Sequence, residues 1–119
     1  MSDRARQLAV AAARSAADDR CEDVVVLDLR GTSPVCDYFV IATGTSDRQL
    51  RAAADHIEEQ ARQRHERPIG QLGRDSAHWI LLDFFDVVVH LFDAEARGYY
   101  DLELLWGDAP RVDWQVAPA

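Results

Sequence analysis

The sequence predicts a single α/β domain, in which a small mixed β-sheet is flanked by helices in the order α-β-β-α-(β)-β-β-α. Three observations support this fold class. The chain has 119 residues, which is the usual size of one domain. Hydrophobic residues make up 48% of it and charged residues 29%, a balance typical of a globular protein and not of a disordered one. Short β-branched runs alternate with longer stretches of helical periodicity.

The first predicted helix covers residues 3–18. Apolar residues recur in it every three or four positions, with the arginines elsewhere, so a narrow stripe rich in alanine faces the interior. A face this thin indicates close packing against the sheet. Residues 24–29 and 37–43 are β-branched runs typical of strands buried on both faces. Because residues 31–36 are too few for a crossover helix, we expect these strands to run antiparallel.

The second predicted helix begins with a capping box at residues 46–49. The Ser46 hydroxyl can accept from the Gln49 amide while the Gln49 side chain reaches back. The helix cannot continue through Pro68. Residues 69–74 contain two glycines and are either a short edge strand or a loop. The inner face of the helix carries Leu50, Ala53, Ala54, Ile57 and Ala61.

Residues 77–83 and 86–92 are two further predicted strands. They are joined at Phe84 and Phe85 by a connection short enough for a hairpin. Residues 95–106 have helical propensity. One face of this last helix carries Tyr99, Leu102, Leu105 and Trp106.

Residues 1–108 are expected to form this one domain, and residues 109–119, with two prolines, a loosely ordered C-terminal tail. The N-terminus has no apolar segment behind its positive charges, and no apolar run reaches 18 residues. We therefore expect neither export nor a membrane span. Cys21 and Cys36 are too few for a disulfide framework and lack the spacing of a zinc site. These features predict a cytoplasmic protein.

The charge of the chain points to the kind of partner it would suit. The net charge is -8, and all 13 basic residues are arginine. A chain this acidic has no basic surface for a phosphate backbone, so we expect no direct DNA binding. From residue 83 onward acidic residues greatly outnumber basic ones, which favours a basic partner. The acidic residues are Asp83, Asp86, Asp93, Glu95, Asp101, Glu103, Asp108 and Asp113, and the basic ones are Arg97 and Arg111.

The Gly44-Thr45-Ser46 turn precedes a helix N-terminus, where free amides could hold a phosphate. An ordinary strand-to-helix turn needs the same glycine and cap. Nucleotidyltransferase chemistry also requires two carboxylates alternating on a strand to hold Mg²⁺, and no such pair follows. Asp86 and His90 share a strand face about 13 Å apart, too far for a proton relay, and we expect both to be buried structural groups. We predict no catalytic, cofactor-binding or metal-binding residues; the alternative is a phosphate-handling enzyme that uses this turn.

The tryptophans are the other candidates for function. Trp79 alternates with Leu81 and Asp83 on one strand face, so either this face or the opposite one is core. Tryptophan dominates binding hot spots, which makes Trp79 and Trp106 candidates for partner contact. That both merely fill the core is an equally open interpretation.

Four blocks of sequence, in order and at the right spacing, strongly resemble the ribosomal silencing factor family, also called the Iojap family. The likeness covers roughly residues 5–108. The blocks are DYFVIATGTSDRQ at residues 37–49, AD at 54–55, WILLD at 79–83 with DVVVH at 86–90, and RGYYDLELLW at 97–106.

This resemblance implies a nucleotidyltransferase-like fold without the active site. It also implies binding to the large ribosomal subunit, through its L-fourteen protein, at the face that meets the small subunit. Occupying that face would block subunit joining and lower translation when nutrients are scarce, and self-association as a homodimer is a family property. The implied contact residues are Trp79, Leu81, Asp83, Asp86, Arg97, Tyr100, Glu103 and Trp106.

The sequence departs from the family pattern at two places. Leu72-Gly73-Arg74 stands where the family usually has an acidic residue beside glycine, which removes part of the acidic surface there. Phe85 stands where the hairpin usually has glycine. Because a bulky residue is strained at positive φ, we expect the hairpin turn here to avoid that conformation.

Overall fold

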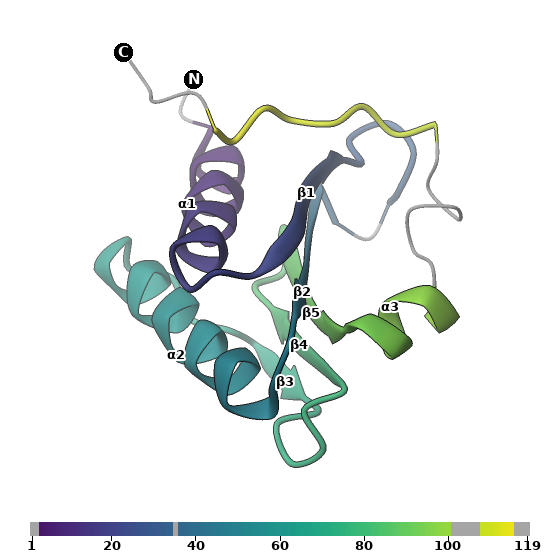
Figure 1. The fold of residues 1–119 in the computed structure, drawn as a ribbon. Coiled ribbons are helices and arrows are strands. Elements are labelled where there is room, and N and C mark those ends of the chain that lie inside the picture. The colour runs from purple at the N-terminus through teal and green to yellow at the C-terminus, as the bar shows by residue number, and fades with distance from the viewer. Residues whose placement is uncertain (1–2, 35, 101–107, 116–119) are drawn as a thin grey trace.

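The computed structural model describes residues 3–34, 36–100 and 108–115, with only the backbone of Tyr100. Two helices cover one face of a five-stranded sheet and a third, short helix packs on the other face (Figure 1). The predicted mixed α/β fold and its order of elements are confirmed. The elements are α1 Arg4–Asp18, β1 Glu22–Asp28, β2 Tyr38–Gly44, α2 Asp47–Gln63, β3 Gly70–Leu72, β4 Trp79–Asp83, β5 Val87–Asp93 and α3 Ala94–Tyr100.

The strands lie in the order β1-β2-β5-β4-β3. β1 and β2 are antiparallel, as predicted, and β2 then runs parallel to β5. β4 and β5 form the predicted antiparallel hairpin. Residues 70–72 pair with β4, so of the two interpretations of residues 69–74 the edge strand is confirmed. The remainder of the helix predicted over residues 95–106 lies outside the described residues.

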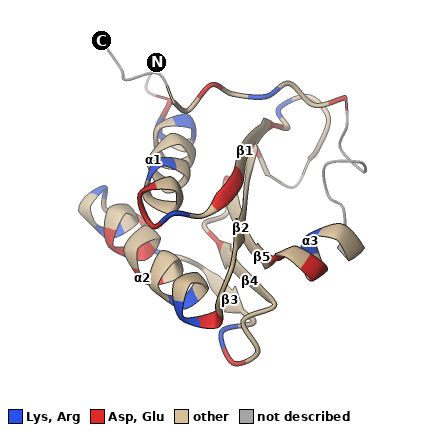
Figure 2. Ribbon diagram, in the orientation of Figure 1, with Lys and Arg blue, Asp and Glu red and all other residues tan. Residues whose placement is uncertain are grey.

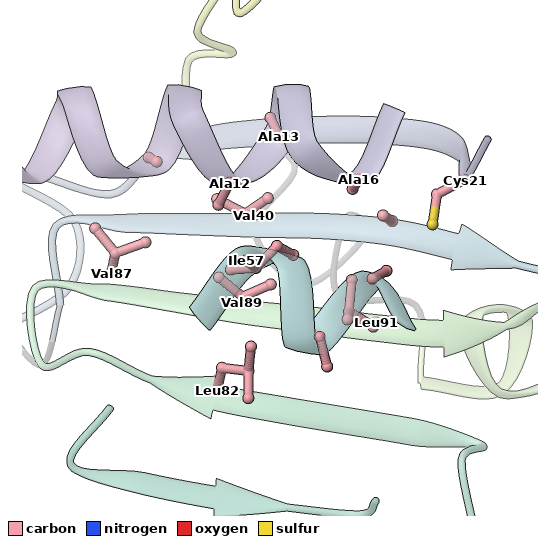
Figure 3. Packing of buried hydrophobic residues seen from close by; sticks show 14 of the residues in the cluster. Ala12, Ala13, Ala16, Cys21, Val40, Ile57, Leu82, Val87, Val89 and Leu91 are labelled. Carbon is pink, nitrogen blue, oxygen red and sulfur yellow. The ribbon is translucent and has the colours of Figure 1, made fainter. Parts of the chain in front are cut away.

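The main core lies between the sheet and the pair α1 and α2. The alanines of the predicted stripe, such as Ala12 and Ala16, are fully buried against β2, which confirms the expected close packing (Figure 3). Ile57 of α2 packs over Val89 and Leu91 of β5 in the same cluster. The small alanine side chains of α1 let the backbone of this helix approach the sheet, so larger residues at these positions would overpack the layer.

The ends of α1 and α2 are fixed by local hydrogen bonds. Asp3 caps α1 by accepting from the Arg6 amide at 3.0 Å. At the end of α2, the Glu66 amide donates to the Ala61 carbonyl at 2.9 Å, and His65 takes a positive φ of 63°. The chain therefore leaves the helix before Pro68, as predicted. No helix within the described residues is long and apolar enough to cross a membrane.

Residues 108–115 run back across the molecule to the start of α1 (Figure 1). The Asp28 amide donates to the Pro110 carbonyl at 2.8 Å, and the Val112 amide donates to the Val26 carbonyl at 2.9 Å. The Trp114 indole N–H donates to the Val24 carbonyl at 3.0 Å. This segment thus covers the outer edge of β1. The division into a domain over residues 1–108 and a loose tail over 109–119 stays a prediction, although these contacts tie residues 110–114 to the sheet.

The β4–β5 hairpin turns at Phe85, whose φ is 78°. The expectation that this turn avoids positive φ is therefore wrong. The Asp86 amide donates to the Phe84 carbonyl at 3.0 Å, which makes a γ-turn around Phe85. The Phe85 amide in turn donates to Asp83 Oδ1 at 2.8 Å. These two hydrogen bonds hold the left-handed conformation that side-chain sterics alone disfavour.

Candidate interaction surface

Strand β4 separates the core from a partly open face of the sheet. Ile80 and Leu82 point to α1 and α2 and are fully buried. Trp79, Leu81 and Asp83 alternate with them and are only partly buried, on the face opposite α1 and α2. This face is not fully exposed to solvent, because a second apolar cluster that includes Ile41 and Phe92 lies on it. Trp79 was interpreted either as a partner contact or as a core residue. The structure shows a side chain that is neither fully buried nor freely exposed.

Trp79 belongs to a group of four rings, here called the aromatic cluster: Phe39, Trp79, His90 and Phe92. The ring centroids of Phe39 and His90 are 4.6 Å apart in an edge-on arrangement. Those of Trp79 and Phe92 are 5.2 Å apart and stacked. The Trp79 indole N–H donates to His90 Nδ1 at 3.1 Å. The indole is thus held in one orientation by packing and by a hydrogen bond.

His90 is neutral because burial lowers its pKa to about 4. Since Nδ1 accepts from Trp79, the imidazole proton is on Nε2. Nε2 is buried and has no hydrogen-bond partner within the described residues. The expectation of a buried structural group at this position is confirmed for His90. For Asp86 it is wrong, because that residue is exposed at the hairpin turn.

An apolar row crosses the sheet from the aromatic cluster to its edge. Strand pairing places His90 beside Leu81, and Leu81 beside Leu72 of the edge strand β3. Leu72 is 68% exposed. The partly open face therefore continues as apolar surface to the outermost strand. The sequence alone did not identify Leu72 or His90 as part of this face, because only the register of the strands brings them beside β4.

Three carboxylates, Asp37, Asp83 and Asp86, lie at the hairpin end of this face. The Asp37 amide donates to the Asp86 carbonyl at 2.8 Å, which ties the hairpin to the start of β2. Burial raises the pKa of the Cys36 thiol to about 11, and the negative charges of all three carboxylates add to this rise. None of the three forms a salt bridge with another described residue. The open face thus has an acidic end.

Helix α3 carries Glu95 in its first turn and Arg97 in its last (Figure 2). Arg97 Nη1 donates to Thr43 Oγ1 at 2.8 Å and to the Asp23 carbonyl at 2.5 Å. These bonds attach the helix to β1 and β2, so the Arg97 side chain supports the fold whatever else it contacts. The structure does not describe three of the other expected contacts: the side chain of Tyr100, and the whole of Glu103 and Trp106. Tyr99, which was not among them, is 82% exposed.

The turn considered for phosphate binding is closed by its own residues. The Thr45 amide donates to Gln49 Oε1 at 2.5 Å, and the Gln49 amide donates to Ser46 Oγ at 3.1 Å, which confirms the cap. A Cβ on Gly44 would lie 2.5 Å from Leu50 Cδ2, so packing explains the glycine. In residues 3–34, 36–100 and 108–115, no three His, Cys, Asp or Glu side chains are grouped to hold a metal ion.

Comparison with known proteins places this chain in a family. The family model "Ribosomal silencing factor during starvation" matches residues 2–119. The ribosomal silencing factor of Bacillus subtilis is 47% identical over 102 residues, which are 86% of each chain. The mouse protein named "Mitochondrial assembly of ribosomal large subunit protein 1" is 32% identical over 74% of this chain and 40% of its own length.

Solved structures agree with this match. A crystal structure of a Chromobacterium violaceum protein covers 100% of this chain and 97% of its own, with a TM-score of 0.83 and 29% identity. One from Bacillus halodurans covers 91% and 95%, with a TM-score of 0.75 and 37% identity. Sequence and structure together show that this chain belongs to the ribosomal silencing factor family.

Proposed function

We propose that this protein represses translation by binding the large ribosomal subunit and excluding the small one. In this proposal it docks on the L-fourteen protein, at the face where the two subunits meet, and acts in the cytoplasm when nutrients are limiting. Family membership supports a silencing role. The name of the mouse relative, which refers to the large ribosomal subunit, supports that subunit as the partner.

The observation that carries the proposal is the state of Trp79. It lies partly exposed on an apolar face and is fixed by a hydrogen bond to a buried histidine. An aromatic side chain already held in one rotamer loses little conformational freedom when a partner covers it. Such residues are typical binding hot spots. We infer that Trp79 and Leu81 make the apolar centre of the interface.

The acidic end of the face sets the kind of partner. Asp83 and Asp86 would meet basic groups on L-fourteen and orient the protein on it. The remaining expected contacts, Arg97, Tyr100, Glu103 and Trp106, would extend the interface along the C-terminal helix. Repression needs no chemical step in this account. A folded chain whose smallest extent is 27 Å cannot fit between two subunits that meet face to face.

The test is binding of Trp79→Ala to isolated large subunits, measured by co-sedimentation over a range of protein concentrations. We expect affinity to fall about 30-fold, the equivalent of about 2 kcal/mol at a hot spot. Trp114→Ala is the matched control, because this tryptophan bonds to Val24 on another part of the molecule. If Trp79→Ala remains folded and co-sediments like the unmodified protein, the proposed interface is wrong.

The self-association implied by the family resemblance is tested in the same assay. A homodimer that used the partly open face around Trp79 would compete with the ribosome, because one face cannot contact two partners at once. We therefore propose that large subunits convert any dimer to a bound monomer, as light scattering with and without subunits would report.

A further inference from the structure

Phe85 combines two unfavourable features at the tip of the β4–β5 hairpin. Its φ of 78° lies in the left-handed region, at the centre of a γ-turn, where a residue with a bulky side chain is strained. Its side chain is also 65% exposed, although it is large and apolar. A glycine would adopt this backbone conformation without steric conflict. The fold itself therefore gives no reason for a phenylalanine here.

The hydrogen bonds of the turn do not involve the Phe85 side chain. They join the backbone of residues 84–87 and the carboxylate of Asp83. In the described chain, the other residues at positive φ that are not glycine are small or polar: Arg20, Asp23, His65 and Ala77. Phe85 is thus the one apolar residue of that group with a large side chain facing solvent.

Hydrogen bonds hold the backbone of the hairpin tip at an acidic position of the molecule. The Asp86 carbonyl accepts from the amides of Asp37 at 2.8 Å and Tyr38 at 3.0 Å, so the turn is bonded to the start of β2. Asp37, Asp83 and Asp86 surround this point, and no salt bridge to a described residue neutralises them. The phenyl ring is therefore presented on a fixed backbone with negative charge around it.

We propose that Phe85 is an anchor of the partner interface, which it extends from Trp79 to the hairpin tip. The ring enters an apolar recess on a protein surface of the large subunit, and basic side chains on the rim of that recess pair with Asp83 and Asp86. This inference rests on the proposed function. A protein partner is favoured over ribosomal RNA because the carboxylates would repel a phosphate backbone.

The distance between the two anchors suits one interface. Trp79 and Asp83 are four residues apart on β4, about 13 Å by strand rise, and Phe85 is two residues farther. A standard interface covers about 800 Å² per partner, which corresponds to a patch roughly 30 Å across. Both rings therefore fit within one contact area. The apolar row and the acidic end of the face lie within the same area.

The experiment compares Phe85→Gly with His65→Gly in the complete chain. His65 is exposed, has a φ of 63° at the end of α2, and lies away from the Trp79 face. Both changes relieve a left-handed conformation, so we expect both to raise the thermal midpoint by at least about 2 °C. Only Phe85→Gly should weaken co-sedimentation with large subunits, by about tenfold or more.

Phe85→Asn provides a second variant, since asparagine tolerates positive φ and has no ring. We expect it to lose affinity as Phe85→Gly does while remaining folded. If both Phe85 variants bind like the unmodified protein, the proposal that Phe85 is an anchor is wrong and the proposed function stands. If either variant lowers the thermal midpoint in step with affinity, Phe85 is structural and the inference is overturned. If the unmodified protein fails to bind large subunits, the proposed function and this inference fall together.

Discussion

Replacing His90 with phenylalanine should remove much of the acid sensitivity of the folded state. The imidazole is 4% exposed, packs among the other rings of the aromatic cluster, and accepts a hydrogen bond from Trp79. Phenylalanine fills a similar space and cannot be protonated. It also removes the buried Nε2–H group that has no partner within the described residues. At pH 7 the variant loses one hydrogen bond, a cost of about 1 kcal/mol.

The loss of unfolding free energy at low pH follows from the pKa of His90. Burial lowers it from 6.5 to about 4 in the folded state. The unfolded chain therefore binds a proton at a pH where the folded chain does not. Stability is complete above about pH 6.5 and is lost as the pH falls toward 4. One pKa unit corresponds to about 1.4 kcal/mol, so the loss from this group is roughly 2 kcal/mol at pH 5 and roughly 3 kcal/mol at pH 4.

The assay is urea unfolding followed by tryptophan fluorescence at pH 7 and pH 5, for the unmodified chain and His90→Phe. His56 and His78 have raised pKa values because Asp19 and Asp93 accept hydrogen bonds from them, so they act in the opposite direction. Because both chains contain these pairs, their effect cancels in the comparison. We expect the variant to gain about 2 kcal/mol relative to the unmodified chain on going to pH 5. An equal loss of unfolding free energy in the two proteins would refute the reasoning.

Two further predictions concern backbone packing and surface charge. Gly73→Ala should lower the unfolding free energy by more than about 2 kcal/mol in urea, because φ is 89° and the new Cβ would lie 1.8 Å from the Trp79 carbonyl oxygen. Gly31→Ala, at a φ of 88° where the new Cβ would meet no atom within 4 Å among the described residues other than its chain neighbours, should cost only about 1 kcal/mol, and equal losses would contradict the clash. His78 should titrate above pH 6.5 by NMR, since Asp93 accepts its hydrogen bond at 2.5 Å. Asp93→Asn should return that midpoint toward 6.5, and an unchanged midpoint would exclude the pair.

Local patterns predicted most of the fold because each element carries its own signal. The alanine stripe of α1 and the cap at Ser46 depend only on residues close in sequence, and both were confirmed. Features that depend on distant residues were not predicted. Residues 110–112 lie along β1 through contacts with a strand more than 80 residues earlier, and no local pattern records that pairing. At Phe85 a rule of side-chain sterics failed because hydrogen bonds to the turn held the disfavoured conformation.

The contact residues stay a prediction, and only part of their arrangement could be expected from the sequence. Strand alternation placed Trp79 and Leu81 on one face of β4 and Ile80 and Leu82 on the other, because side-chain direction has a period of two, but it did not say which face is core. The same alternation could not identify His90 as the residue that holds Trp79, since that contact depends on the register of β4 against β5. The family resemblance suggested Arg97 as a contact residue. Its bonds to Thr43 and to the backbone of β1 show a structural role that the resemblance did not indicate.

Two features that lower local stability lie at the border of the proposed interface. The Nε2–H group of His90, which has no partner within the described residues, costs about 1 to 3 kcal/mol, and the positive φ of Phe85 costs a similar amount. A domain of this size is stable by only about 5 to 15 kcal/mol, so together they are a substantial fraction. An apolar side chain at position 90 and a glycine at position 85 would avoid both. Features that oppose local stability are expected at functional sites. Because His90 orients Trp79 and Phe85 ends the same hairpin, these costs support the proposed interface on physical grounds that do not depend on the family match.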